Sequence, residues 1–120
     1  MERLTSFRFG ATHWNVRSDV QRVAVEVAAR YGCTWNTYED HPPGLGLDAV
    51  SVDFWGKGGR GDALGPTKRR RISRYIRTRN GGPRWRWVIN GRKGYYPGGA
   101  TFVPPGGAEW NAGHVHVTYA

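Results

Sequence analysis

The chain has little cysteine and no long apolar run. Cys33 is the only cysteine among the 120 residues, so no internal disulfide is possible and we expect a small buried side chain there. No stretch approaches the roughly 18 apolar residues that span a membrane. The first residues, MERLTSFRFGATHWNVRSD, lack the apolar core of a secretory signal. The protein therefore either acts without such a signal or is a domain of a longer exported chain.

Acidic residues are also scarce. The formal net charge is +9, and residues 57–93 contain thirteen of the eighteen lysines and arginines but only one acid, Asp62. A solvated helix face explains part of this excess. A polyanionic partner explains more of it, and nucleic acid, an anionic membrane and an anionic bacterial wall all fit. Hydrophobic residues make up 38% of the chain, which predicts one globular domain rather than disorder.

Hydrophobic periodicity predicts two helices and five strands. Their order is helix, strand, strand, helix, hairpin, strand, over residues 18–32, 33–38, 49–55, 66–80, 84–96 and 113–120. We therefore expect an α+β fold with helices packed on a small, mostly antiparallel sheet.

Local signals refine these elements. Ser18 or Asp19 is suited to cap the first helix, and Gly32 to end it. Pro66 fits the first turn of the second helix. Asn90-Gly91 is the expected hairpin turn, and residues 97–107 are expected to form a loop.

Two sets of side chains admit more than one interpretation. In residues 49–55, alternation predicts Val50, Val52 and Phe54 in the core. Asp53, on the other face, could orient a group near the site, but a solvent-facing carboxylate is the favoured interpretation. Trp85 and Trp87 alternate with arginines. This pattern predicts either a surface that binds a glycan or peptide, or two tryptophans packed on the core with the arginines outside.

Two of the four histidines lie in the final strand. His114 and His116 are two residues apart, so they share a face of that strand. His41 opens the loop HPPGLGLD, which ends at Asp48. Histidine nitrogens and a carboxylate oxygen are ligands for zinc, and three protein ligands with a fourth position for water are typical of a catalytic site.

The pattern His41-Pro-Pro-Gly-Leu-Gly-Leu-Asp48, followed by His114-Val-His116, resembles the zinc peptidases of the D-Ala-D-Ala carboxypeptidase and hedgehog fold. The actinobacterial and phage branch that ends in HVHV is the most similar. The resemblance covers residues 18–120, so residues 1–17 are an N-terminal extension of a single domain, 1–120. It implies zinc ligation by His41, Asp48 and His116, with His114 lining the site.

The resemblance also implies a function. The substrate would be a peptidoglycan stem peptide, cut by a carboxypeptidase or an endopeptidase, and the location would be the cell wall or exterior, or the cytoplasm for a phage-type lysin. Peptidoglycan or another anionic cell-wall polymer is the implied partner.

Two positions depart from the family. Glu39 replaces a serine of the first motif, and Gly113 replaces the acid that usually serves as general base. Glu109, seven residues before His116, and His114 are the remaining candidates to carry the proton. Gly113→Asp is expected to restore the usual acid, provided that the backbone there does not need a positive φ.

Three hypotheses remain from the sequence. The first is an active zinc peptidase. The second is an inactive, zinc-containing module that binds a peptide or protein. The third is a nucleic-acid binder that uses residues 57–93. No recognised nucleic-acid-binding motif in the sequence supports this third hypothesis.

Overall fold

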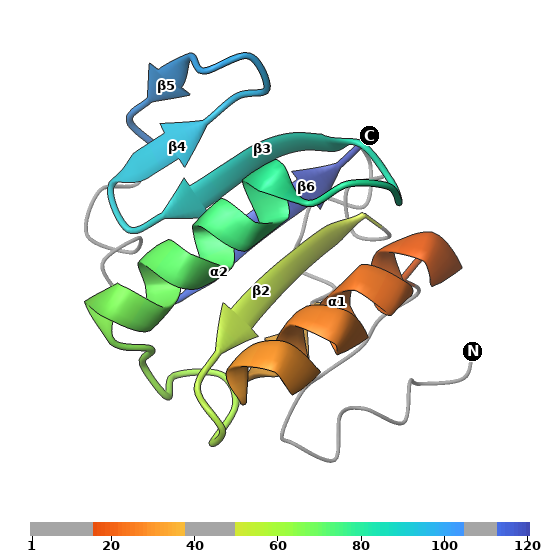
Figure 1. Ribbon diagram of the computed structural model, residues 1–120. Helices are drawn as coiled ribbons and strands as arrows, with labels where there is room; N and C mark the ends of the chain where they lie inside the picture. Colours follow the sequence, from red (N-terminus) through yellow and green to blue (C-terminus); the bar gives the residue numbers. More distant parts are fainter. Residues whose placement is uncertain (1–15, 38–49, 105–112) are drawn as a thin grey trace.

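The computed structural model describes residues 16–37, 50–104 and 113–120. Within them, two helices lie on one face of a six-stranded sheet (Figure 1). The elements are α1 (Ser18–Tyr31), β1 (Thr34–Asn36), β2 (Ser51–Trp55), α2 (Pro66–Thr78), β3 (Trp85–Asn90), β4 (Lys93–Tyr95), β5 (Thr101–Phe102) and β6 (Val115–Tyr119). All the strand pairs are antiparallel, which confirms the α+β class and the antiparallel sheet.

The strand order is β1-β2-β6-β3-β4-β5. The last strand in the sequence, β6, therefore lies inside the sheet between β2 and β3. In its central row Val117 is the partner of Val52 on one side and of Val88 on the other. These three valines are fully buried and form the sheet side of the core.

Helix α1 covers this apolar face with the stripe that its spacing predicts. Val20, Val23, Ala24 and Val27 are buried, and Ala28 and Tyr31 pack at the margin. The helix ends at Gly32, as expected, in the left-handed conformation with φ 63°.

The expected cap at the start of α1 was wrong. Arg17 occupies the N-cap position and makes no capping hydrogen bond with its side chain. The carboxylate of Asp19 instead accepts hydrogen bonds from Nε of Arg17, at 2.6 Å, and from the amide of Val20, at 2.9 Å.

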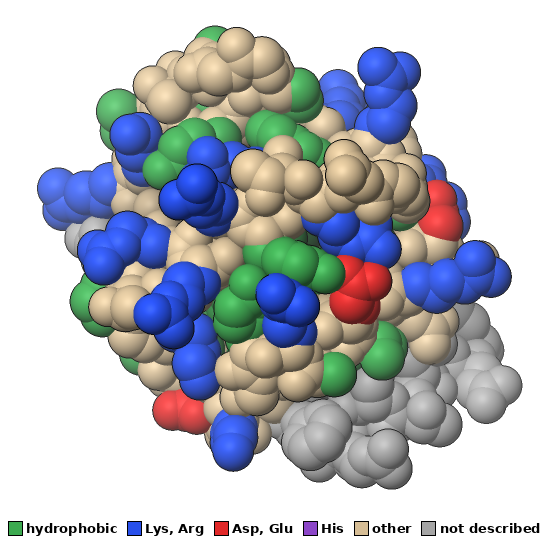
Figure 2. Space-filling model, in the orientation of Figure 1, with side chains coloured by type: hydrophobic (Ala, Val, Ile, Leu, Met, Phe, Trp, Pro, Cys, Tyr) green, Lys and Arg blue, Asp and Glu red, His purple; other side chains and the backbone are tan. Residues whose placement is uncertain are grey.

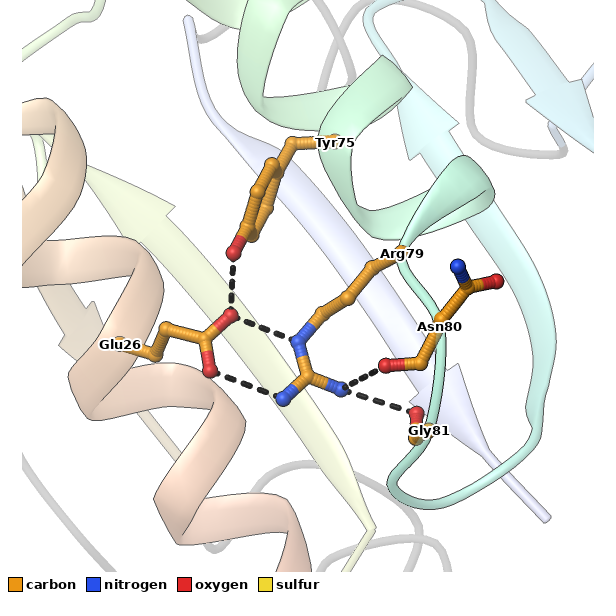
Figure 3. Close-up of polar contacts among 5 residues, drawn as sticks. All are labelled: Glu26, Tyr75, Arg79, Asn80 and Gly81. Atoms are coloured by element: carbon orange, nitrogen blue, oxygen red, sulfur yellow. Dashed lines mark hydrogen bonds and ion pairs between the residues drawn. The ribbon is translucent and has the colours of Figure 1, made fainter.

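Helix α2 begins at Pro66 and packs on the same face through Ile72 and Ile76. A polar cluster joins its C-terminal end to α1 (Figure 3). Glu26 of α1 accepts hydrogen bonds from the hydroxyl of Tyr75 and from Nε and Nη2 of Arg79, the latter two at 2.6 and 2.8 Å. Nη1 of Arg79 donates to the carbonyl of Gly81 at 2.9 Å. The pKa of Glu26 falls to about 2, chiefly because Arg79 donates to the carboxylate.

Two details of the sheet differ from the sequence expectation. Asn90 is the Cα partner of Lys93, so the hairpin turn is Gly91-Arg92, one residue later than predicted, with Gly91 at φ 62°. The expected loop after β4 contains the short strand β5, in which Phe102 lies across Gly94. A Cβ at Gly94 would lie 2.2 Å from the Phe102 ring, so the missing side chain lets the ring pack there.

Neither helix in the described ranges is long and apolar enough to cross a lipid bilayer.

Candidate functional site

The predicted site residues divide into two groups. His41, Asp48 and Glu109 lie outside the described residues, so their predicted roles remain predictions. His114 and His116 are described and buried, with 9% and 7% of their surfaces exposed. The two histidines share a face of the sheet, as their spacing predicts, because both approach the same carboxylate oxygen.

That oxygen belongs to Asp53, on the neighbouring strand β2. Asp53 is the Cα partner of His116 in the β2–β6 ladder. Nδ1 of His116 lies 2.8 Å from Oδ1 of Asp53, and Nε2 of His114 lies 3.8 Å from the same oxygen. Asp53 is itself 7% exposed. The sheet thus has a buried cluster of one carboxylate and two imidazoles on the face opposite the helices.

The prediction that Asp53 faces solvent was therefore wrong. Alternation correctly separates Ser51 and Asp53 from the core face, but all five residues of β2 are buried. Polar side chains can occupy a buried sheet face when neighbouring strands supply hydrogen-bond partners. Ser51 has such a partner in the hydroxyl of Thr118, at 2.9 Å. The sequence signal that could have found this site is a carboxylate in the middle of a strand whose neighbours Val52 and Phe54 are apolar.

Hydrogen bonds continue from the cluster along β6. Nε2 of His116 lies 2.8 Å from the hydroxyl of Thr118, which in turn contacts Ser51. Because an ionised carboxylate only accepts, Nδ1 of His116 donates to Asp53, and in the neutral ring Nε2 is the acceptor. The chain of contacts Asp53–His116–Thr118–Ser51 fixes the orientation of the imidazole ring, as carboxylates commonly do for histidines that bind metals.

Trp55 fixes the second histidine. Its ring stacks on His114 with centroids 4.4 Å apart and planes inclined by 17°. Trp55 lies two residues after Asp53 on β2, so the same strand supplies the carboxylate and the stacking ring. This contact was not predicted from the sequence.

The donor atoms of the cluster are of the kinds that zinc prefers, one carboxylate oxygen and imidazole nitrogens. In the structure, both ring nitrogens of His116 form hydrogen bonds, Nδ1 with Asp53 and Nε2 with Thr118. Within residues 16–37, 50–104 and 113–120, no group of three or more His, Cys, Asp or Glu side chains is arranged to hold a metal ion. A complete zinc site would need a further ligand from the rest of the chain.

The backbone at position 113 requires a glycine. This is the position at which the zinc peptidases named above usually carry the catalytic acid. Its φ is +84°, and a Cβ there would lie 2.6 Å from Cβ of Ala63. Its carbonyl accepts a hydrogen bond from the amide of Leu64 at 2.8 Å. The backbone here does have a positive φ, so an aspartate at position 113 would be strained and would collide with Ala63. The expectation that Gly113→Asp restores activity is therefore wrong.

Trp85 and Trp87 lie on opposite faces of β3. A register shift at Arg86 makes them the partners of Tyr119 and Thr118, which are consecutive residues. Trp85 packs against the helix-side core, which confirms the packing interpretation for this residue. Trp87 lies beside Thr118, next to the histidine cluster. A surface cavity of about 670 Å³ runs past both rings and past the exposed Arg84 and Arg86.

Comparison with known proteins gives no match, whether to family models, to curated proteins or to solved structures.

Proposed function

We propose that this chain is a zinc-dependent peptidase-like domain of the D-Ala-D-Ala carboxypeptidase and hedgehog type, acting on peptidoglycan stem peptides. The observation that carries the proposal is the buried cluster of Asp53 on β2, His116 on β6 and His114 directly before β6. The His-x-His motif and the antiparallel sheet with both helices on one face agree with the sequence resemblance.

The buried polar cluster is expected to reduce the stability of the fold, so its presence suggests a functional role. Burying a carboxylate and two imidazoles costs free energy that hydrogen bonds recover only in part, and apolar side chains of similar size are often at least as stable there. The row on the other side of the same strands is built from Val52, Val117 and Val88. A polar cluster beside such a row is typical of a functional site.

We keep His41, Asp48 and His116 as the zinc ligands, with His116 as the ligand supplied by the described strands. Asp53 accepts a hydrogen bond from Nδ1 of His116, so we assign it the role of orienting that ring and leaving Nε2 for the metal. When bound, zinc would polarise a peptide carbonyl and acidify a water molecule. In the rival assignment Asp53 turns from His116 and binds the metal in place of Asp48.

The other residues position the substrate and carry protons. Trp55 holds His114 in place beside Asp53, so His114 can accept or donate a proton next to the ligands. Glu109 remains the second candidate for that role. The cavity along Trp87 and Arg86 begins one strand from His116, and we assign it to the peptide substrate.

The alternative function is a zinc-containing module that binds peptide without cutting it. Gly113 favours this alternative, because its positive φ and its contact with Ala63 exclude an acid at the position where the family places one.

Two measurements test the proposal. The first is zinc content after purification, compared between wild type, His116→Ala, Asp53→Asn and Asp48→Asn. We expect one zinc per wild-type chain, none in His116→Ala, and a larger loss in Asp48→Asn than in Asp53→Asn. The reverse order for the two aspartates would make Asp53 the ligand, and full zinc occupancy in His116→Ala would contradict the metal site altogether.

The second measurement is the release of amino acids or peptides from purified peptidoglycan. Release by wild type that is lost in His116→Ala supports the peptidase. Zinc binding without release supports the binding module. If wild type releases products, Glu109→Gln and His114→Gln identify the proton carrier, with at least a roughly tenfold loss of rate expected when that carrier is removed.

A further inference from the structure

Helix α2 carries a dense group of exposed cations. Lys68, Arg70, Arg71 and Arg74 are all exposed, and we call them the α2 cationic surface. The helix contains no acidic residue. Figure 2, in the orientation of Figure 1, shows lysine and arginine side chains gathered over the region of α2 with few acidic side chains among them. Within the described residues no acid forms an ion pair with these four cations.

This arrangement works against the stability of the helix. Arg70 and Arg74 are four residues apart, so two like charges lie side by side on one helix face. Lys68 stands in the first turn, where the helix dipole favours acids, and no acid is present there. Helix α1 shows the usual pattern, with Asp19 in its first turn. Helix stability therefore does not explain the α2 cationic surface.

The other arginines at α2 have structural contacts. Nη1 of Arg69 donates to the carbonyl of Leu64 at 2.6 Å. The guanidinium of Arg77 lies 3.9 Å from the ring centroid of Tyr95, and Arg79 is paired with Glu26. The chain thus separates arginines that hold the fold together from cations that face outward.

We infer that the α2 cationic surface binds a flexible phosphodiester polymer without bases, of the poly(glycerol phosphate) kind found in bacterial cell walls. Closely spaced, exposed cations neutralise successive phosphates and release their counterions. Single-stranded nucleic acids are held largely by bases stacked on open aromatic rings. Beside α2, Tyr95 is in contact with Arg77 and Tyr75 with Arg30, so arginines already lie over these rings.

The identification of a cell-wall polymer rests on the function proposed above, but the surface itself does not. Helix α2 lies on one face of the sheet, and Asp53 with its histidines lies on the other. The polymer can therefore stay bound while the opposite face handles a peptide. Binding should not depend on zinc or on His116.

The test is a titration with poly(glycerol phosphate) at several salt concentrations. We compare wild type with Arg70→Gln/Arg74→Gln and with a control of equal charge change, Arg22→Gln/Arg84→Gln, which removes exposed arginines outside α2. At about 0.1 M salt we expect affinity to fall at least roughly tenfold in the α2 variant and less than about threefold in the control. The slope of log K against log salt should decrease in magnitude by about 1–2 in the α2 variant only.

Three further readouts decide the inference. The melting temperature of Arg70→Gln/Arg74→Gln should equal or exceed that of wild type, since a repulsive pair is removed. Equal losses of affinity in both double variants would contradict binding at the α2 cationic surface and would show that only the net charge matters. Tighter binding per phosphate to single-stranded or duplex DNA than to poly(glycerol phosphate) would overturn the polymer class.

His116→Ala separates this inference from the proposed function. The variant should lose zinc and keep polymer binding. If wild type binds zinc and releases peptides but does not bind the polymer, this inference is wrong and the proposed function stands.

Discussion

At the scale of single residues, Gly113 joins the start of the final strand to the loop before α2. Gly113→Ala should lower the free energy of unfolding by about 2 kcal/mol or more, because it combines backbone strain at positive φ with overpacking against Ala63. The measurement is urea unfolding. Gly61→Ala is the matched control, since Gly61 has φ +90° and a Cβ added there would meet nothing within 4 Å. Similar losses in the two variants would show that the contact with Ala63 contributes little.

Cys33 is the second residue with a specific expectation. It is 4% exposed, and burial raises the pKa of its thiol to about 11. The reactive thiolate is therefore rare at neutral pH. A thiol reagent such as iodoacetamide should leave the native protein unlabelled near neutral pH and label it fully in denaturant. Rapid labelling of the native protein would show that the segment between α1 and β1 opens readily.

The histidine cluster could be predicted from the sequence only in part. Spacing alone placed His114 and His116 on one face, because strand alternation is a local rule. It could not bring Asp53 to them, because that contact depends on which strands become neighbours and joins residues 63 apart in the chain. The positive φ of Gly113 was a stated condition whose outcome only the backbone could supply.

At the scale of elements, the cluster of Glu26, Tyr75 and Arg79 ties α1 to the end of α2. The pKa of Glu26 is lowered from 4.5 to about 2, so the carboxylate favours the folded state when ionised. Its stabilising effect is present above pH 4.5 and is lost as the pH falls through 2. Its side chain is 38% exposed, so solvent screening limits the contribution to about 1 kcal/mol.

We therefore expect Glu26→Gln to be less stable than wild type at about pH 6 and nearly equal to it at about pH 2. Denaturant unfolding at the two pH values measures this difference. Asp19→Asn, which removes a more exposed ion pair with Arg17, is the control and should show a smaller change. A difference between Glu26→Gln and wild type that is the same at both pH values would contradict the pKa of Glu26.

Both helices and five of the six strands in the described sheet followed from periodicity, because amphipathic stripes and alternation are local. The short strand β5 was missed, since its two residues carry no periodic signal and pair only because Phe102 packs across Gly94. The hairpin turn lies one residue later than the Asn-Gly signal predicts because Asn90 pairs with Lys93 as the last residue of β3.

At the scale of the whole molecule, the proposed zinc site contributes to the stability of the folded chain. Metal that binds only the folded chain adds its binding free energy to folding. Free zinc at about 100 times its dissociation constant adds about 2.7 kcal/mol, so the melting temperature should rise by roughly 10 °C. Calorimetry with zinc and with a chelator measures the shift. His116→Ala should show none, and a shift of equal size in that variant would indicate binding elsewhere.

The position of β6 has a consequence for synthesis. On one side of it stand β1 and β2, on the other β3, β4 and β5, and the two groups pair only through β6. While a ribosome is still translating the residues before 113, the nascent chain holds two separate half-sheets, each with an open edge. Such edges pair readily with other chains. The protein is therefore most exposed to aggregation just before β6 emerges, and chaperone binding would help it most at that moment.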